Sequence, residues 1–294
     1  MASERILGFV LAGGEGLRLR PLTHECAKPA LGFAGGYRLV DFVLSNLVNS
    51  DIDPIYVLTQ YKPDTLVRHI AAVWGPRIKV LSPRTGDPCG YRGTAIAVQQ
   101  NLDVVERDRP ELVAVFAADH VYRMDVRQMA AFHRARRAQA TVAAVAVPLE
   151  SARSFGVIAA RRDGRVLEFQ EKPTCPRPLP GEPGRAYASM GNYLFEPEFL
   201  AQALGEMEQR GGIDFGHHLL PYLSGRYRVF AYDLAANVLP GVRPYEEPAY
   251  WRDVGTLPAL IAARRDVQGA RPRFNLRNPS WPIHGHPEEE RDIA

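Results

Sequence analysis

Cysteine is rare in this sequence, and no apolar run is long. The 294 residues include three cysteines, whose odd number and lack of short paired spacings predict neither a disulfide framework nor a zinc site. The longest apolar runs, residues 6–12, 112–118 and 140–149, fall well short of the ~20 residues that span a bilayer. We therefore expect no transmembrane helix and no membrane partner. Because the N-terminus also lacks the pattern of a signal peptide, we expect a cytoplasmic protein.

Lysine is also scarce, and neither acidic nor basic residues are clustered along the sequence. Of the 36 basic residues only those at positions 28, 62, 79 and 172 are lysines, so a lysine within a motif is more informative than an arginine. The formal net charge is +3, with acidic and basic residues mixed along the chain, which excludes the footprint of a nucleic-acid-binding protein. The content of 46% hydrophobic and 23% charged residues is typical of a globular protein.

Apolar runs alternate with amphipathic segments through the first half of the chain. Runs rich in Ile and Val predict strands buried on both faces, and apolar residues at helical spacing predict helices between them. The expected strands are residues 6–12, 55–59, 78–81, 112–118 and 141–147. The expected helices are residues 38–48, 63–74, 94–105 and 126–138. This order predicts an α/β fold with a mostly parallel central sheet and helices on both of its faces.

Beyond residue 148 the pattern changes to shorter strands and turns. The expected strands are residues 156–159, 166–169, 187–195 and 227–232. The expected helices are residues 197–207, 215–223 and 257–265. We expect these segments to form a smaller lobe on the same sheet. Residues 1–267 are thus predicted to be one domain, and residues 268–294, rich in Pro, Asn, Arg and Glu, an extended or partly disordered tail.

A glycine-rich segment follows the first predicted strand directly. It reads Leu11-Ala12-Gly13-Gly14-Glu15-Gly16-Leu17-Arg18. Glycines let backbone N–H groups approach a polyphosphate closely, and an arginine adds charge-assisted hydrogen bonds. The spacing is neither that of a Walker A loop nor that of the dinucleotide-binding fingerprint. A tight turn without a ligand is the other interpretation, and the glycines alone do not decide between the two.

This segment opens a series of motifs that together resemble the bacterial glucose-1-phosphate adenylyltransferases. The motifs follow one another over about residues 6–266 and read RLRPLT, AKPA, GGYRLVDF, TQY, YRGTA, ADHVYRMD, FGV, FQEKP, ASMGNY, DFG and YWRDVGT. The resemblance implies a Rossmann-like nucleotidyltransferase fold whose smaller lobe binds a sugar. It also implies Mg²⁺-dependent transfer of an adenylyl group from ATP to α-D-glucose 1-phosphate, which gives pyrophosphate and ADP-glucose for glycogen or α-glucan synthesis.

The resemblance also implies a role for each matching residue. The catalytic residues would be Arg18, Lys28 and Asp119. Asp119 and Asp253 would hold one Mg²⁺. The nucleotide would be bound by Leu11, Ala12, Gly13, Gly14, Gln60, Gly93 and Thr94. The sugar phosphate would be bound by Gly156, Glu171, Lys172, Ser189 and Asn192, with Lys172 on its phosphate and Glu171 on sugar hydroxyls.

Elementary chemistry supports some of these roles without deciding them. Asp119 directly follows a buried strand, where ligands bind in open α/β sheets, but a lone Asp at a strand end is often a cap or turn residue. Lys28 and Lys172 each precede a proline, and a solvated lysine in a rigid turn is the alternative for either. Gln60 also fits an exposed polar loop. His120 has no evident ligand partner in the sequence, so we do not expect it to bind a metal.

Three departures from the family pattern leave other functions open. Glu25 and Cys26 stand where bacterial members commonly have basic residues, and Ile96 stands where Asp is frequent. The sequence also stops where the family continues into a left-handed β-helix. A nucleotide-binding regulatory or assembly subunit with weak activity is therefore one alternative, and an enzyme that uses another nucleoside triphosphate is the second. A homo-oligomer and a hetero-oligomer with a full-length paralogue both remain open.

Overall fold

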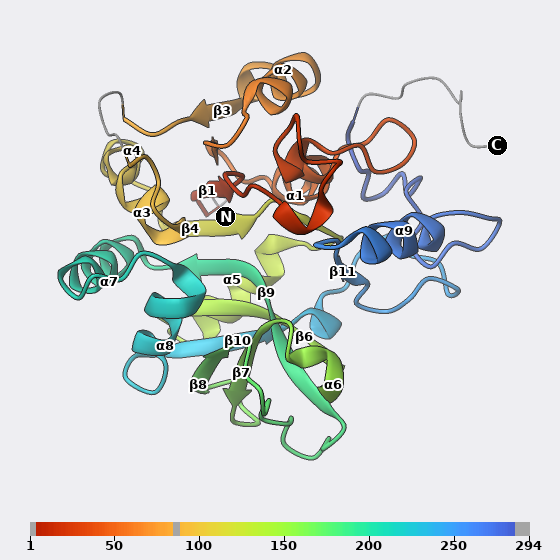
Figure 1. Ribbon diagram of the computed structural model, residues 1–294. Helices are drawn as coiled ribbons and strands as arrows, with labels where there is room; N and C mark the ends of the chain where they lie inside the picture. Colours follow the sequence, from red (N-terminus) through yellow and green to blue (C-terminus); the bar gives the residue numbers. More distant parts are fainter. Residues whose placement is uncertain (1–3, 85–88, 286–294) are drawn as a thin grey trace. The chain divides into compact units, whose positions relative to one another are not determined.

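Two compact units make up the chain in the computed structural model, which describes residues 4–84 and 89–285. The first unit consists of Met1–Phe9, Pro83–Phe116 and Arg127–Asn237. The second unit consists of Val10–Ser82, Ala117–Val126 and Val238–Ala294. Figure 1 labels most helices and strands of each. Because both units combine distant stretches of sequence, residues far apart along the chain meet within one unit.

The first unit is built on strands in the order β10-β6-β9-β4-β1. Their bounds are β1 Ile6–Leu11, β4 Leu112–Ala117, β6 Ala140–Pro148, β9 Arg185–Phe195 and β10 Val229–Asp233. β10 is parallel to β6, and β9 is antiparallel to both β6 and β4, so β4 and β6 run in the same direction. A smaller antiparallel pair, β7 Gly156–Ala160 and β8 Val166–Glu171, continues from β9.

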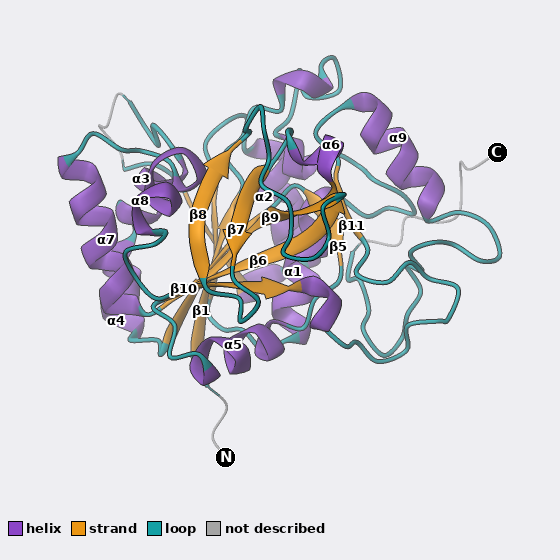
Figure 2. Cartoon of the chain, turned by 90° about the horizontal axis from the view of Figure 1, so that it is seen from below, coloured by secondary structure: helices purple, strands orange, loops and turns teal. Residues whose placement is uncertain are grey.

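Helices flank these strands. Their bounds are α3 Thr94–Gln99, α4 Leu102–Asp108, α5 Val126–Ala135, α6 Leu149–Ala152, α7 Pro197–Gln209 and α8 Leu220–Leu223, with one turn of π-helix at Phe215–Leu219 and a 3₁₀ turn at Leu234–Ala236. Figure 2 shows α3, α4 and α7 together on one side of the strands and α5 on another. The apolar periodicity of the sequence predicts α5 and α7 to within a few residues. The helix predicted over residues 215–223 is instead the π-helical turn followed by α8, and α6 is not predicted.

The prediction of one continuous helix over residues 94–105 is wrong. The segment is broken into α3 and α4 at Asn101, whose φ of −117° and ψ of 19° are not helical. The Asn101 side-chain amide donates to the carbonyl of Ala97 at 2.8 Å, the acceptor that its own backbone N–H would use in an α-helix. That N–H bonds to Val98 instead. Asparagine side chains compete with the helix backbone in this way.

The second unit has two short pairs of strands and three main helices. β2 Ile55–Leu58 is parallel to β3 Ile78–Leu81, and β5 His120–Tyr122 is antiparallel to β11 Trp251–Asp253. The helices are α1 Leu39–Asn49, α2 Asp64–Val73 and α9 Leu257–Asp266, with 3₁₀ turns at Leu17–Leu19, Lys28–Ala30 and Gly75–Arg77. The three-residue strands β5 and β11 are too short for a periodicity to show, and the sequence does not predict them.

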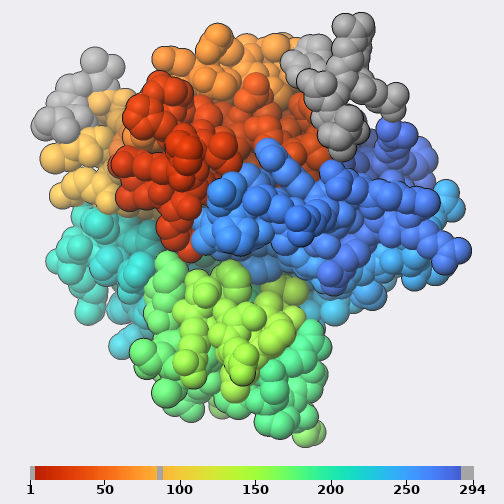
Figure 3. All heavy atoms as spheres, turned by 45° about the vertical axis from the view of Figure 1, so that its right-hand side comes forward, coloured from red at the N-terminus to blue at the C-terminus, as the bar shows by residue number. Residues whose placement is uncertain are grey.

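The described part of the tail packs into the core of the second unit. Residues 268–285 form no helix or strand, yet Phe274, Trp281 and Ile283 are buried. The Phe274 ring lies 4.8 Å from that of Tyr250 and 6.1 Å from that of Phe42, centroid to centroid. Figure 3 shows blue atoms of the last part of the chain against red atoms of the N-terminal part of the same unit. The rest of the predicted tail, residues 286–294, lies outside the described residues, and the domain boundary at residue 267 stays a prediction.

These elements confirm the α/β class with a mostly parallel sheet. Strand and helix alternate through the first half of the chain as predicted, and the smaller pair β7 and β8 lies in the second half. Over residues 4–84 and 89–285, no helix is both long enough and apolar enough to cross a membrane.

Candidate active site

The carboxyl ends of β1 and β4 belong to the second unit, where they align with β2 and β3. The N–H of Ala118 donates to the carbonyl of Leu11, that of Ala12 to Leu58 and that of Thr59 to Leu81, at 3.2, 2.8 and 2.9 Å. The segments that follow β4, β1 and β2 therefore leave the sheet at one edge, and Asp119, Gly13 and Gln60 are the second residues after these strands. A Cβ added to Gly13 would lie 3.7 Å from the Cβ of Gln60. In open α/β sheets this edge is where ligands bind.

Three charged side chains meet at this edge. The Lys28 Nζ donates to Asp119 Oδ2 at 2.8 Å and lies 3.4 Å from Asp253 Oδ1. The Lys28 side chain is only 7% exposed, so its ammonium depends on these two carboxylates for much of its solvation. The pairing of β5 with β11 places Asp253 opposite His120, next to Asp119 in the sequence. The structure thus brings together two carboxylates and a lysine that the sequence predicts separately.

Two glycines allow other groups to approach these charges. A Cβ on Gly255 would lie 2.7 Å from Arg18 Nη2 and 3.0 Å from Asp253 Oδ1, so the guanidinium of Arg18 lies beside the Asp253 carboxylate. Gly16 has a φ of +65°, and a Cβ there would lie 2.9 Å from the Cβ of Lys28. Gly16 also accepts a hydrogen bond from the buried hydroxyl of Thr23 at 2.8 Å. The sequence alone does not mark Gly255 or Thr23 as part of the site, although both lie inside motifs of the series.

The Asp119 carboxyl is ionised at neutral pH. Burial raises the pKa of its carboxyl, but the charges of His120 and Lys28 and the hydrogen bond from Lys28 outweigh burial and lower the pKa to about 2. His120 lies closer to this cluster than the sequence suggests. Its Nε2 is 3.5 Å from Asp119 Oδ1, and its ring packs on that of Trp251 with 5.0 Å between centroids.

The donor set of this cluster fits a divalent metal ion. One ligand atom each from Asp119, His120 and Asp253 lies within 4.8 Å of the other two. Carboxylate oxygens suit Mg²⁺ and Mn²⁺, and an imidazole nitrogen is accepted by transition metals. The Lys28 ammonium between the two carboxylates shows that this position favours positive charge. The sequence alone does not indicate His120 as a ligand, because Asp253 comes from β11, 133 residues further along the chain.

A second group of predicted residues lies in the first unit. The β7–β8 ladder pairs Gly156 with Glu171, and a Cβ on Gly156 would lie 3.1 Å from Glu171 Oε2. Lys172 Nζ lies 3.3 Å from Glu171 Oε1, with the lysine side chain 56% exposed and the glutamate 18%. Lys172 has a φ of +45°, a conformation that directs the chain out of β8. The exposed ammonium is therefore available to an anion, while the glutamate is held against backbone.

Thr94 is held by Asp214, which the sequence does not predict as a site residue. Its hydroxyl donates to Asp214 Oδ2 at 2.7 Å and accepts the N–H of Phe215 at 3.0 Å. Asp214 Oδ1 accepts the N–H groups of Gly216 and His217 at 2.9 and 3.1 Å. Burial raises the pKa of Asp214, but the hydrogen bonds from Thr94, His217 and Gly216 outweigh it and lower the pKa. Asp214 therefore fixes the start of α3; its only sequence signal is the DFG motif.

Ser189 and Asn192 lie on one strand, β9. Ser189 is opposite Ala144 of β6, and Asn192 is opposite Phe116 of β4. The Ser189 hydroxyl accepts the N–H of Gly191 at 3.3 Å, and Asn192 is fully buried. The structure thus places both on the sheet of the first unit, and their sugar-binding roles stay predictions.

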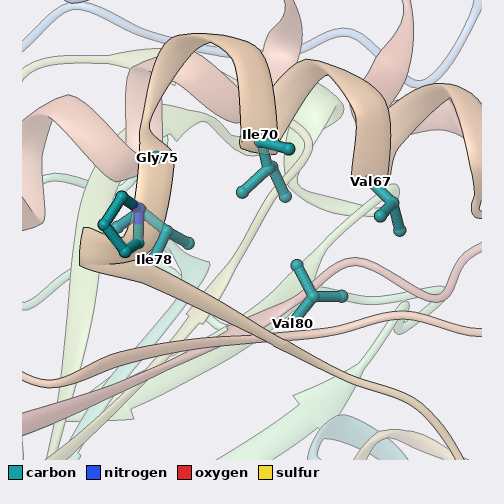
Figure 4. A pocket seen from close by; sticks show the side chains of 7 residues that line it. Val67, Ile70, Gly75, Ile78 and Val80 are labelled. Atoms are coloured by element: carbon teal, nitrogen blue, oxygen red, sulfur yellow. The ribbon is translucent and has the colours of Figure 1, made fainter.

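An apolar hollow elsewhere in the second unit contains none of the predicted residues. Figure 4 shows Val67 and Ile70 of α2 pointing toward Ile78 and Val80 of β3. The complete lining is Val67, Ile70, Ala71, Gly75, Pro76, Ile78 and Val80. Because no polar side chain lines this hollow, it offers nothing that would bind a phosphate or a metal ion.

Replacing Gly93 by alanine should destabilise the protein. A Cβ at this position would lie 2.2 Å from the carbonyl oxygen and 2.8 Å from the carbonyl carbon of Ile213. That oxygen also accepts the N–H of Ala95 at 3.0 Å, so the backbone cannot move away without breaking a hydrogen bond. Overpacking of this kind costs about 1–3 kcal/mol. We expect a loss of about 2 kcal/mol in the free energy of unfolding, measured by urea denaturation.

Gly205→Ala is the matched control for this measurement. Gly205 lies in α7, and a Cβ there meets nothing within 4 Å. Alanine is the better helix former, so this variant should be as stable as the wild type or up to about 1 kcal/mol more stable. If Gly93→Ala is as stable as the wild type, the backbones of Gly93 and Ile213 are not tightly packed against each other.

Known proteins similar to this chain agree on one family. The model of the nucleotidyl transferase family matches residues 7–269. A glucose-1-phosphate adenylyltransferase of Thermodesulfovibrio yellowstonii is 48% identical over 290 residues, which cover 95% of this chain and 70% of that protein. Proteins of the same name from Streptomyces avermitilis and Thermus thermophilus are 49% and 45% identical over 96% of this chain and 71% and 72% of their own lengths. The chain therefore belongs to the nucleotidyl transferase family, among the glucose-1-phosphate adenylyltransferases.

Proposed function

We propose that this protein transfers an adenylyl group from ATP to α-D-glucose 1-phosphate, giving ADP-glucose and pyrophosphate for glycogen or α-glucan synthesis. The names of its relatives support this reaction. The observation that carries the proposal is the cluster of Lys28, Asp119 and Asp253 at the carboxyl edge of the sheet, beside Arg18. A binding subunit without activity has no need of this complete set of charges.

The chemistry assigns a role to each of these charges. A phosphate oxygen of glucose 1-phosphate attacks the α-phosphorus of ATP, and the bond from that phosphorus to the bridging oxygen breaks as pyrophosphate leaves. Nucleotidyltransferases of this family generally use a divalent metal. We assign Mg²⁺ to the carboxylates of Asp119 and Asp253; when bound, it neutralises phosphate charge. Lys28 and Arg18 bind the phosphates that leave and stabilise their growing charge.

The remaining predicted residues bind and orient the two substrates. We assign the backbone from Leu11 to Gly14 to the ATP phosphates, because glycines there leave the N–H groups accessible. Gln60, Gly93 and Thr94 are assigned to the adenosine. The residues assigned to the sugar phosphate are Gly156, Glu171, Lys172, Ser189 and Asn192. The Thr94 hydroxyl is already bonded to Asp214 and Phe215, so its part is to fix the start of α3 while backbone groups contact the base.

Pyrophosphate release tests this function directly. The purified chain is given Mg²⁺ and glucose 1-phosphate with ATP, UTP, GTP or dTTP in turn, and Asp119→Asn is the control for contaminating activity. We expect release with ATP that is at least about tenfold faster than with the other nucleotides. Faster release with one of the others would identify a different base specificity. No release with any of the four, from folded protein that binds ATP, would favour a regulatory or assembly subunit.

A further inference from the structure

Strand β11 carries Asp253 but is only three residues long. A strand of this length has few ladder hydrogen bonds to hold it, so its orientation depends on side chains. Arg252 provides these contacts. Its Nη1 and Nη2 donate to the two carboxylate oxygens of Glu247 at 3.0 and 2.6 Å, and its Nε donates to Asp266 Oδ2 at 3.0 Å. This is a two-pronged arginine–carboxylate pair with a second carboxylate on its third donor, a geometry that restricts rotation as well as distance.

Arg273, in the tail, contacts the same two carboxylates as Arg252. Arg273 Nη2 lies 2.6 Å from Glu247 Oε2, and its Nη1 lies 3.5 Å from Asp266 Oδ1, so both carboxylates are shared by two arginines. The backbone follows the same course: the N–H of Glu247 donates to the carbonyl of Arg273 at 2.9 Å, and that of Phe274 donates to Asp266 at 3.2 Å. Four alternating charges thus join the loop before β11, the end of α9 and the tail.

A buried ion pair lies next to this network and uses the same tail residues. Arg123, which directly follows β5, donates to Glu246 at 3.0 Å, with side chains only 4% and 2% exposed. Glu246 also accepts the N–H groups of Arg243 and Asn275, both at 2.9 Å. The Phe274 ring lies 4.2 Å from the Arg123 guanidinium carbon. The tail segment Arg273–Asn275 therefore contacts both strands of the β5–β11 pair through their flanking residues.

We propose that Arg252 is a positioning residue, clamped by Glu247, Asp266 and the tail segment Arg273–Asn275, that orients Asp253 toward the divalent cation. Successive side chains of a strand point to opposite faces, so fixing Arg252 on one face of β11 fixes the direction of Asp253 on the other. Replacing a residue that hydrogen-bonds to a metal ligand or orients it typically weakens metal binding about 10- to 100-fold. This inference rests on the metal-binding role of Asp253 in the proposed function.

The test measures Mn²⁺ binding without substrate or turnover. Mn²⁺ alone is titrated into the full chain, and free Mn²⁺ is followed by electron paramagnetic resonance for the wild type, Arg252→Gln, Arg252→Lys and Arg273→Gln. We expect about tenfold weaker binding for Arg252→Gln. Arg252→Lys keeps the positive charge but cannot form the two-pronged pair with Glu247. Its Mn²⁺ affinity should therefore lie between those of the wild type and Arg252→Gln. Arg273→Gln removes contacts of a side chain that is 60% exposed, so its loss should be smaller, about two- to fivefold.

Arg265→Gln is the matched control, because Arg265 is an exposed arginine of α9 outside the network. Its Mn²⁺ affinity should equal that of the wild type. Melting temperatures are measured for every variant. If Arg252→Gln and Arg273→Gln melt earlier but bind Mn²⁺ as the wild type does, the network only stabilises the fold and the proposal is overturned. The Asp253→Asn variant tests the proposed function separately from the role of Arg252. Unchanged Mn²⁺ affinity in that variant would remove Asp253 from the metal site and contradict the proposed function itself.

Discussion

The Asp119→Asn variant is expected to lose about a thousandfold in kcat while keeping its fold. Asparagine has the same shape as aspartate and still offers an oxygen to Lys28 Nζ, which lies 2.8 Å from Asp119 Oδ2. It lacks the negative charge that a divalent cation requires, and a metal ion at a phosphoryl group supplies several kcal/mol of charge stabilisation in the transition state. Since each 1.36 kcal/mol is a factor of ten in rate, a loss of about 4 kcal/mol gives this factor.

Pyrophosphate release at saturating ATP and glucose 1-phosphate measures this kcat. The control is Asp103→Asn, which makes the same chemical change at a side chain that is 65% exposed on α4 and should leave kcat unchanged. Thermal melting separates chemistry from folding. An Asp119→Asn variant that is folded and turns over at the wild-type rate would take Asp119 out of the mechanism and would leave Asp253 as the acidic residue to examine.

The sequence predicts the parts of this protein that depend on local pattern. Strands such as residues 78–81 show as runs that contain Ile, Val and Leu, and the observed β3 has these bounds, although only its Ile78 is buried. The position of Asp119 directly after such a run predicts its place at the edge of the sheet, where the structure has it. Both inferences work because a strand's side-chain pattern and the residue that follows it are adjacent in the chain.

Features that depend on long-range pairing were not predicted. Strands β5 and β11 have three residues each, and neither has a pattern of its own; they exist because they pair with each other. His120 becomes a candidate ligand only through that pairing. The break at Asn101 was missed for a different reason, since it results from one side-chain hydrogen bond within a segment whose apolar periodicity is continuous.

The Lys172→Ala variant should raise KM for glucose 1-phosphate by about 10- to 100-fold and change kcat and KM for ATP by less than about threefold. Hydrogen bonds to charged groups contribute about 1.5–3 kcal/mol, which corresponds to this range of affinity. The Lys172 ammonium is well placed to make such a bond, because its side chain is 56% exposed and its contact with Glu171 Oε1 is 3.3 Å long. Binding a phosphate in the ground state and in the transition state equally changes KM and leaves kcat nearly constant.

Lys62→Ala is an unusually close control for this variant. Lys62 also precedes a proline and also has a positive φ, 37° compared with 45° for Lys172, so both substitutions carry the same backbone cost. Its side chain is 37% exposed. Initial rates over a matrix of both substrate concentrations give the two KM values for each variant. A rise in KM for ATP alone in Lys172→Ala would reverse the assignment of the two substrates. Equal effects on KM for glucose 1-phosphate in both lysine variants would trace the change to the turn that precedes the proline, and would remove the phosphate contact of Lys172.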